Sequence, residues 1–186
     1  MSTKKISPYR RKREGRTNYK KRLILLKSKN LRLIIRKTNK HLIMQIAEYN
    51  PVGDKILFGI NSSALKKLGW NYSCANTPAC YLTGLLLGRK ALAKKITGAI
   101  PDLGLQTTMS GSKLYAAIKG AIDAGMKIPA SEEIFLSKER LNGEHIANFF
   151  AINKNQVQFS GYNKLKLDAA KIKNDFEEFK KKIMSG

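Results

Sequence analysis

Hydrophobic and polar residues alternate in the first third of the chain in a pattern that predicts β-strands. The first strand is predicted at Leu31–Lys37, and a polar turn at residues 38–40 joins it to a second strand at His41–Tyr49. A third run, Lys55–Ser62, has a continuous apolar centre, which is typical of a strand deep in a sheet. Because the connections are short and polar, the three strands are expected to form an antiparallel meander.

The first of these strands indicates a sheet with two unequal faces. Its side chains form two alternating sets, which are Leu31, Leu33 and Ile35 on one side and Arg32, Ile34 and Arg36 on the other. The second set is basic except for Ile34. This apolar residue among cations indicates that the second face is also partly covered.

Before the strands, the spacing of apolar residues predicts a short helix over Thr17–Ser28. Thr17 is a favourable residue for its N-cap. Tyr19, Leu23 and Leu26 fall on one side of this helix at helical spacing, and lysines and arginines cover the rest. We expect the apolar side to dock on the body of the protein.

After the strands, the most strongly predicted helix of the chain spans Pro78–Ile96. Thr77 is a favourable N-cap, and proline suits the first turn of a helix. The first half is apolar on nearly every side, so it must be buried from several directions. Cys80, Gly84 and Gly88 recur every four residues and form a flat stripe that allows another backbone to approach closely.

The rest of the chain is predicted to be mostly helical. The further elements are a short helix, a strand and three helices: Ala64–Leu68, Ala99–Leu105, Lys113–Met126, Lys138–Phe149 and a last helix capped by Asp168. Tyr162 is placed in a polar loop. The last helix carries an apolar stripe of Ala169, Ile172, Phe176, Phe179 and Ile183. That stripe fits two hypotheses equally well: a docking face for another protein, or packing against its own domain.

These elements predict an α/β fold, with a mixed sheet made of the antiparallel meander plus a further strand and covered by helices. Three segments follow from the pattern: a basic arm with a short helix at residues 1–28, an α/β core at 29–130, and a mostly helical C-terminal extension at 131–186.

Charge sharpens this picture. The 186 residues include 36 Lys and Arg against 13 Asp and Glu, which gives a net charge of +23. Residues 1–22 alone carry ten basic residues and one acidic residue, whereas residues 131–186 carry ten basic and eight acidic residues. The gradient suggests that the N-terminal half faces nucleic acid and that the C-terminal end faces protein or solvent.

The highest density of positive charge lies in the stretch YRRKREGRTNYKKR at residues 9–22. Glu14 is its only acid, and no protein core can hold so many unpaired cations. The segment therefore lies on a surface, where Tyr9 and Tyr19 at its two ends can stack on unpaired bases. A solubilising, disordered tail is the alternative explanation.

Little in the sequence favours catalysis or bound metal. Cys74 and Cys80 provide too few ligands for a zinc site, and His41 and His145 lie far from them in sequence. The chain has no apolar run long enough to cross a membrane, and its first residues lack a hydrophobic signal core, so we expect neither membrane insertion nor secretion.

Neither a nucleotide-binding loop nor a nuclease active site is supported by the residues present. Gly111-Ser112-Lys113 at a helix start lacks the spacing of a nucleotide-binding phosphate loop, although its amides can still hold a phosphate of a nucleic acid. A metal-dependent nuclease needs converging carboxylates. The body has few, which are scattered along it: Glu48, Asp54, Asp102 and Asp123. We expect no catalytic residue, metal site, cofactor or small-molecule substrate.

Several segments together resemble a known family. RRKREGRTNYKKRLILL, RLIIRKTNKHLIMQI and NTPACYLTGLLLGRKAL, followed in order by DLGL and SGSKLYAAIKGAIDAG, are similar to the universal eighteenth protein of the large ribosomal subunit, in its archaeal form. That family binds 5S rRNA, and the resemblance implies a ribonuclease-H-like α/β core used for binding without catalysis. The implied location is the large ribosomal subunit in the cytoplasm, with 5S rRNA, large-subunit rRNA and neighbouring ribosomal proteins as partners.

The resemblance also implies which residues contact RNA. In the arm these are Tyr9, Arg10, Arg11, Lys12, Arg13, Arg16, Tyr19, Lys20 and Arg22. At the tip of the predicted hairpin they are Arg36, Lys37, Asn39, Lys40 and His41, and near the end of the long helix they are Arg89 and Lys90, with Lys94 and Lys95 beside them. Two alternatives remain: a nucleic-acid-processing enzyme of the same fold and a basic protein that compacts nucleic acid.

Overall fold

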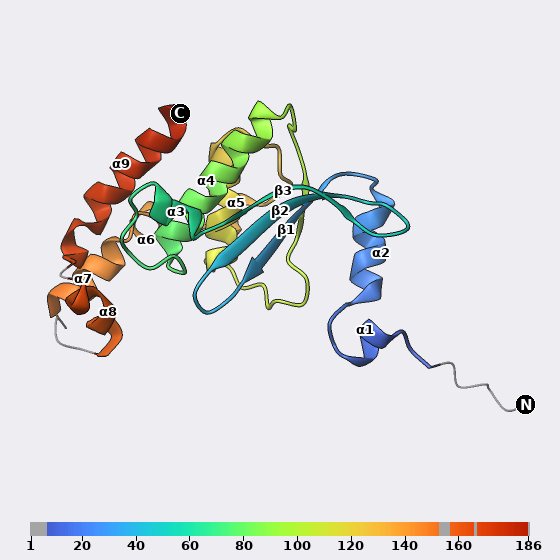
Figure 1. Ribbon diagram of the computed structural model, residues 1–186, viewed down its shortest axis with the longest axis horizontal. Helices are drawn as coiled ribbons and strands as arrows, with labels where there is room; N and C mark the ends of the chain where they lie inside the picture. The colour runs from blue at the N-terminus through green and yellow to red at the C-terminus, as the bar shows by residue number, and fades with distance from the viewer. Residues whose placement is uncertain (1–6, 153–156, 166, 186) are drawn as a thin grey trace, which may run out of the picture.

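The computed structural model describes residues 7–152, 157–165 and 167–185, and its centre is a four-stranded sheet (Figure 1). The strands are β1 (Arg32–Lys37), β2 (Leu42–Glu48), β3 (Lys55–Asn61) and β4 (Ile100–Asp102). They lie in the order β3-β2-β1-β4. The pairs β1–β2 and β2–β3 are antiparallel, and β4 joins β1 in parallel. The predicted meander, further strand and mixed α/β sheet are confirmed.

Helices account for most of the remaining elements. In the N-terminal two thirds they are α1 (Arg10–Arg13), α2 (Tyr19–Lys27), α3 (Ala64–Lys67), α4 (Thr77–Ala93) and α5 (Lys113–Asp123). In the C-terminal extension they are η1 (Glu132–Ile134), α6 (Lys138–Leu141), α7 (Glu144–Ile152), η2 (Val157–Phe159), α8 (Ser160–Lys164), η3 (Ala169–Lys171) and α9 (Ile172–Ser185). The arm lies at one side of the sheet and α9 at the other (Figure 1).

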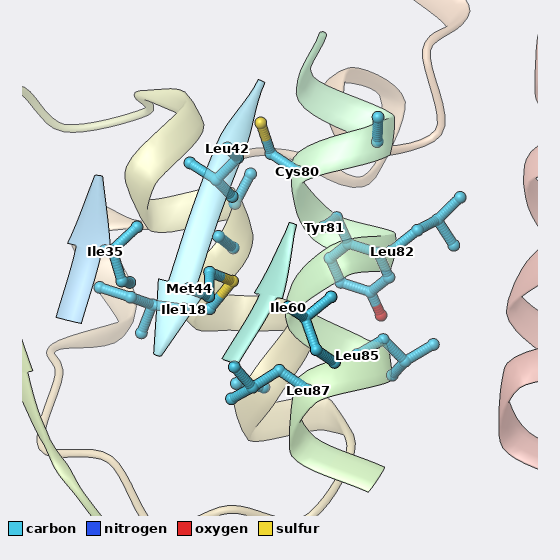
Figure 2. Packing of buried hydrophobic residues seen from close by; sticks show 14 of the residues in the cluster. Ile35, Leu42, Met44, Ile60, Cys80, Tyr81, Leu82, Leu85, Leu87 and Ile118 are labelled. Carbon is cyan, nitrogen blue, oxygen red and sulfur yellow. The ribbon is translucent and has the colours of Figure 1, made fainter. Parts of the chain in front are cut away.

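The core lies between the sheet and the pair α4 and α5. Alternate residues of the central strands, such as Ile35 and Met44, are fully buried there. They pack in one cluster with side chains of the two helices, such as Leu87 and Ile118 (Figure 2). The first half of α4 is buried on nearly every side, as the sequence predicted, because the sheet, α5 and α9 all contact it.

The small-residue stripe of α4 has the predicted consequence. A Cβ atom on Gly84 would overlap the backbone carbonyl of Ala117 in α5, and one on Gly120 would overlap the carbonyl of Tyr81 in α4. The two helices therefore touch through their backbones at reciprocal glycines. Leu85, which directly follows Gly84 in α4, is 1% exposed.

The predicted N-caps of α2 and α4 are each wrong by one residue, whereas the predicted cap Asp168 is confirmed, since its side chain accepts a hydrogen bond from the amide of Ala170. Asn18, not Thr17, caps α2, and its side chain accepts a hydrogen bond from the amide of Lys21. Asn76, not Thr77, caps α4 in the same way. In each case an asparagine lies next to the threonine, and asparagine is the stronger N-cap of the two.

The C-terminal extension differs most from the prediction. The single helix expected at Lys138–Phe149 is two helices, because Gly143 between them has a φ of +86° and ends α6 in the left-handed region. Tyr162, expected in a loop, belongs to α8 and packs edge-on against Tyr72 with ring centroids 5.8 Å apart.

The apolar stripe of the last helix packs against its own domain. Phe176 lies 5.5 Å from the ring of Tyr81, and Phe179 lies edge-on to Trp70 at 5.4 Å. The carboxylate of Asp175 accepts a 2.6 Å hydrogen bond from the hydroxyl of Tyr72. Of the two hypotheses for this stripe, the intramolecular one describes the structure.

Candidate nucleic-acid interface

The basic arm presents its cations to solvent. Every described residue from 7 to 16 is exposed, and the single turn α1 consists entirely of arginine and lysine. Within the described part of the chain, Lys12, Arg13 and Lys20 take part in no ion pair. These charges are therefore available to an external anion.

Glu14 shapes the arm without neutralising it. Its carboxylate lies 2.8 Å from Nε of Arg10 and 3.1 Å from Nε of Arg16. Arg11 donates a 2.9 Å hydrogen bond to the hydroxyl of Thr17. Exposed pairs of this kind contribute only about 0–1 kcal/mol each, so a phosphate can replace them at little cost.

The two tyrosines at the ends of the arm lie side by side. The rings of Tyr9 and Tyr19 are 5.2 Å apart and tilted by 43°, and Tyr9 remains 74% exposed. Turning of the chain between α1 and α2 brings them together, with Gly15 at a φ of +63°. The pair forms one exposed aromatic surface rather than two separate platforms for bases.

The arm is fastened to the body by polar contacts rather than by the predicted apolar side of α2. Leu23, assigned to that side, is 59% exposed. The contacts are instead made by Arg22, whose Nη2 lies 2.9 Å from Oδ1 of Asp54, and by Lys21, whose Nζ donates to the carbonyl of Gly104 at 3.3 Å. The prediction of apolar docking was therefore wrong: none of the residues of α2 is buried.

Beneath this contact lies a network of ion pairs centred on a buried arginine. Arg32 is 1% exposed, and its Nη2 lies 2.6 Å from Oδ2 of Asp54 while its Nη1 donates to Asp102 at 3.2 Å. Asp54 also pairs with Arg22, and Asp102 also pairs with Arg36. We call these five residues the ion-pair network. Its two carboxylates, which the sequence showed only as scattered, lie on either side of one guanidinium.

Sequence reasoning missed this network because its members are far apart in the chain. Asp102 lies 70 residues from Arg32. A usable signal was present: Arg32 occupies the strand face that Ile34 marks as partly covered, and a buried arginine requires carboxylates. Asp102 ends β4, which pairs directly with the strand that carries Arg32, whereas Asp54 comes just before β3, which β2 separates from that strand.

The network fixes the ionisation of Asp54. Burial raises the pKa of this carboxyl group, but the hydrogen bonds and charges of Arg32 and Arg22 outweigh that effect, so its pKa lies below the ordinary value of 3.8. The carboxylate is charged at neutral pH and continuously attracts both guanidinium groups.

The predicted hairpin tip divides between the two faces of the sheet. Arg36 points to the arm side, where it donates to the carbonyl of Asp102 at 2.6 Å and pairs with its carboxylate at 3.2 Å. Lys37, Asn39 and Lys40 are exposed at the turn. His41 is half-buried, and its backbone closes the turn with hydrogen bonds to Thr38.

The cations near the end of α4 form a separate group. Arg89 is half-buried, and Lys90, Lys94 and Lys95 are exposed. Lys94 places its ammonium 5.1 Å from the ring centre of Phe58. Since α4 begins beside the hairpin tip and has 17 residues, this group lies roughly 24 Å along the helix from that tip.

The described residues hold no cluster of three or more His, Cys, Asp or Glu side chains that suits a metal ion. Asp54 and Asp102 do converge, but the guanidinium group of Arg32 lies between them. In the same residues, no helix is both long and apolar enough to span a bilayer.

Comparison with known protein families finds a match in the first part of the chain. The family described as "Ribosomal large subunit proteins 60S L5, and 50S L18" matches residues 4–100. The matched segment includes the arm, the meander and the whole of α4, and it ends where β4 begins. It therefore contains every member of the ion-pair network except Asp102 and every residue that the sequence proposed for RNA contact.

Proposed function

The chain belongs to the family of ribosomal large subunit proteins 60S L5 and 50S L18, and from this premise we propose that it binds 5S rRNA and attaches it to the rRNA of the large subunit. Membership makes it a structural, RNA-binding constituent of the ribosome. The finer assignment rests on one observation: exposed cations that take part in no ion pair within the described residues lie next to α2, which the ion-pair network holds against the body.

The proposal follows from the charge of RNA. A protein that neutralises phosphates releases the counterions around them, which drives binding without any need for base contacts. Within the described residues, the arm offers cations that take part in no ion pair, such as Lys12, Arg13 and Lys20, and others such as Arg10 whose exposed pairs are weak. The Tyr9–Tyr19 pair adds an aromatic surface for an unpaired base.

The other basic groups suit a protein that holds two RNA segments. The arm and the exposed cations of the hairpin tip would engage the sugar-phosphate backbone of 5S rRNA. The group at the end of α4, with Lys90 and Lys95 exposed, would reach neighbouring large-subunit rRNA. The nearly balanced extension would contact protein or solvent.

The test is the salt dependence of binding to 5S rRNA. If about eight phosphates are neutralised, the plot of log K against log salt should have a slope of roughly −6 to −7. Replacing Lys12, Arg13 and Lys20 by glutamine should reduce the magnitude of that slope by roughly 2–3, because each contact contributes about 0.7–0.9.

A matched control removes the same charge elsewhere. Lys164, Lys171 and Lys181 are exposed residues of the C-terminal extension, and their replacement by glutamine should leave the slope within error of the parent. Equal losses from both triple variants would show that net charge, not the arm, governs binding. Equal affinity for duplex DNA of the same length would favour a compacting role instead.

A further inference from the structure

A basic cavity lies on the helix side of the sheet, away from the arm. It has a volume of about 610 Å³ and opens beside the turn of the β1–β2 hairpin. Its wall is formed by side chains from the hairpin, from the first turns of α4 and α5, and from α6, including Lys37, His41, Thr77, Ser112, Lys113 and Arg140. Among the residues that the structure describes, no aspartate or glutamate lines it. We call it the tip cavity.

Two polar atoms at this cavity have no hydrogen-bond partner in the described part of the chain. The hydroxyl of Ser112, at the N-cap of α5, is buried and makes no hydrogen bond, so the first amides of that helix lack a side-chain cap. The Nδ1 atom of His41 is likewise buried and unpaired. Thr77, only 6% exposed, adds a hydroxyl at the first turn of α4. A hydroxyl and an imidazole nitrogen of this kind can bind an external polar group, and the basic side chains of the cavity wall favour an anion.

The parity of β1 separates this cavity from the arm. Successive residues of a strand point to opposite faces, so Arg36 projects to the arm side while Lys37 projects to the helix side. Accordingly Arg36 lines the small cleft of about 160 Å³ beneath the arm, and Lys37 lines the tip cavity. Two adjacent basic residues thus serve two different surfaces.

We propose that the tip cavity binds a phosphodiester of an RNA strand other than the one held by the arm, and this inference rests on the proposed function. Lys37, Lys113 and Arg140 would surround the phosphate, and the open amides of α5 would donate to it. The volume suits one nucleotide. In the stretch Gly111-Ser112-Lys113, which fails as a nucleotide-binding loop, the amides of Gly111 and Ser112 already donate to carbonyl groups, so the Ser112 hydroxyl and the Lys113 ammonium would contact the RNA phosphate.

A thiol placed in the cavity wall tests this directly. Lys113→Cys puts a thiolate at a helix N-terminus beside Arg140, where it should react rapidly with iodoacetamide. The natural Cys74 and Cys80 are 4% and 1% exposed and give little background. Lys171→Cys, exposed on the C-terminal extension, is the control. Alkylation is measured on the full chain without RNA, with saturating 5S rRNA, and with 5S plus large-subunit rRNA.

The expected result is at least a tenfold slower alkylation of Lys113→Cys with RNA, and an unchanged rate for Lys171→Cys. Protection by 5S rRNA alone would assign the cavity to that molecule, and protection only with large-subunit rRNA would make it a bridge. Full reactivity in both saturated complexes would overturn the inference while leaving the proposed function intact. Failure of the unmodified chain to bind any of these RNAs would instead remove the proposed function, and this inference with it.

Discussion

The buried Arg32 offers the sharpest test of how the ion-pair network contributes to the free energy of unfolding. In the native chain this guanidinium lies between Asp54 and Asp102 and is 1% exposed. Removing one partner of a buried ion pair costs about 3–5 kcal/mol, because the other charge remains buried without compensation. The double variant Asp54→Asn/Asp102→Asn should therefore lose about that much free energy of unfolding.

The sign of the change in the free energy of unfolding caused by Arg32→Met distinguishes a contribution from the charge of Arg32 from a contribution of its packing. In the native background, Arg32→Met leaves Asp54 with Arg22 and Asp102 with Arg36, so we expect a loss of about 1.5–3 kcal/mol. In the double-asparagine background the same substitution removes an unpaired buried charge. It should then raise the free energy of unfolding by about 1–4 kcal/mol.

Urea unfolding at pH 7, followed by circular dichroism, measures all four proteins. Differences of this size are large against a total stability of about 5–15 kcal/mol, and an unchanged m-value would show that two-state unfolding holds. Glu144→Gln removes the exposed partner of Lys173 and should leave the midpoint unchanged. If Arg32→Met destabilised both backgrounds equally, Arg32 would contribute through its aliphatic stem and not through its charge.

Three further predictions concern the helix pair, the buried thiol and acid. Gly84→Ala should destabilise the protein by about 1–3 kcal/mol or more, because its Cβ meets the Ala117 carbonyl, whereas Gly53→Ala, with open space around it, should leave the urea midpoint nearly unchanged. Cys80→Ala should leave the dissociation constant for 5S rRNA unchanged, since burial raises the pKa of this thiol to about 12 and keeps it inert; weaker binding by a folded variant would contradict this. Because the folded-state pKa of Asp54 is lowered, its stabilisation is present above pH 3.8 and is lost as pH falls further; urea midpoints between pH 5 and 3 should drop less steeply in Asp54→Asn.

Local patterns in the sequence were sufficient for most of the core. Strand alternation located β1 and β2 because one face of each is buried, and the glycine stripe of α4 correctly predicted a close helix contact at Gly84. These features depend on neighbours within a few residues, which is the range that periodicity reports. Such local patterns could not show that the predicted helix is interrupted at Gly143. Glycine is tolerated inside a helical pattern, so only its observed φ of +86° reveals the end of α6.

Features that depend on distant residues could not be obtained in this way. The burial of Arg32 requires Asp54 from just before β3 and Asp102 from the end of β4, and sheet topology alone brings these together. The tip cavity likewise joins a strand end to residues about 75 and 100 positions later, Ser112 and Arg140. A charge count cannot distinguish such anchored cations from free ones.

The position of each cation along the arm decides which of two roles it has. The residues closest to the body, Lys21 and Arg22, contact Gly104 and Asp54, whereas Lys12 and Arg13 in the turn beyond take part in no ion pair with the residues that the structure describes. A cation that pairs inside the protein holds α2 in place, and the fixed helix limits the positions that the other cations of the arm can take. An arm without such pairs would lose more conformational entropy when it became ordered on RNA. Anchoring at Arg22 removes part of that entropy cost before RNA binds, so the carboxylates of the network favour RNA binding although they repel RNA.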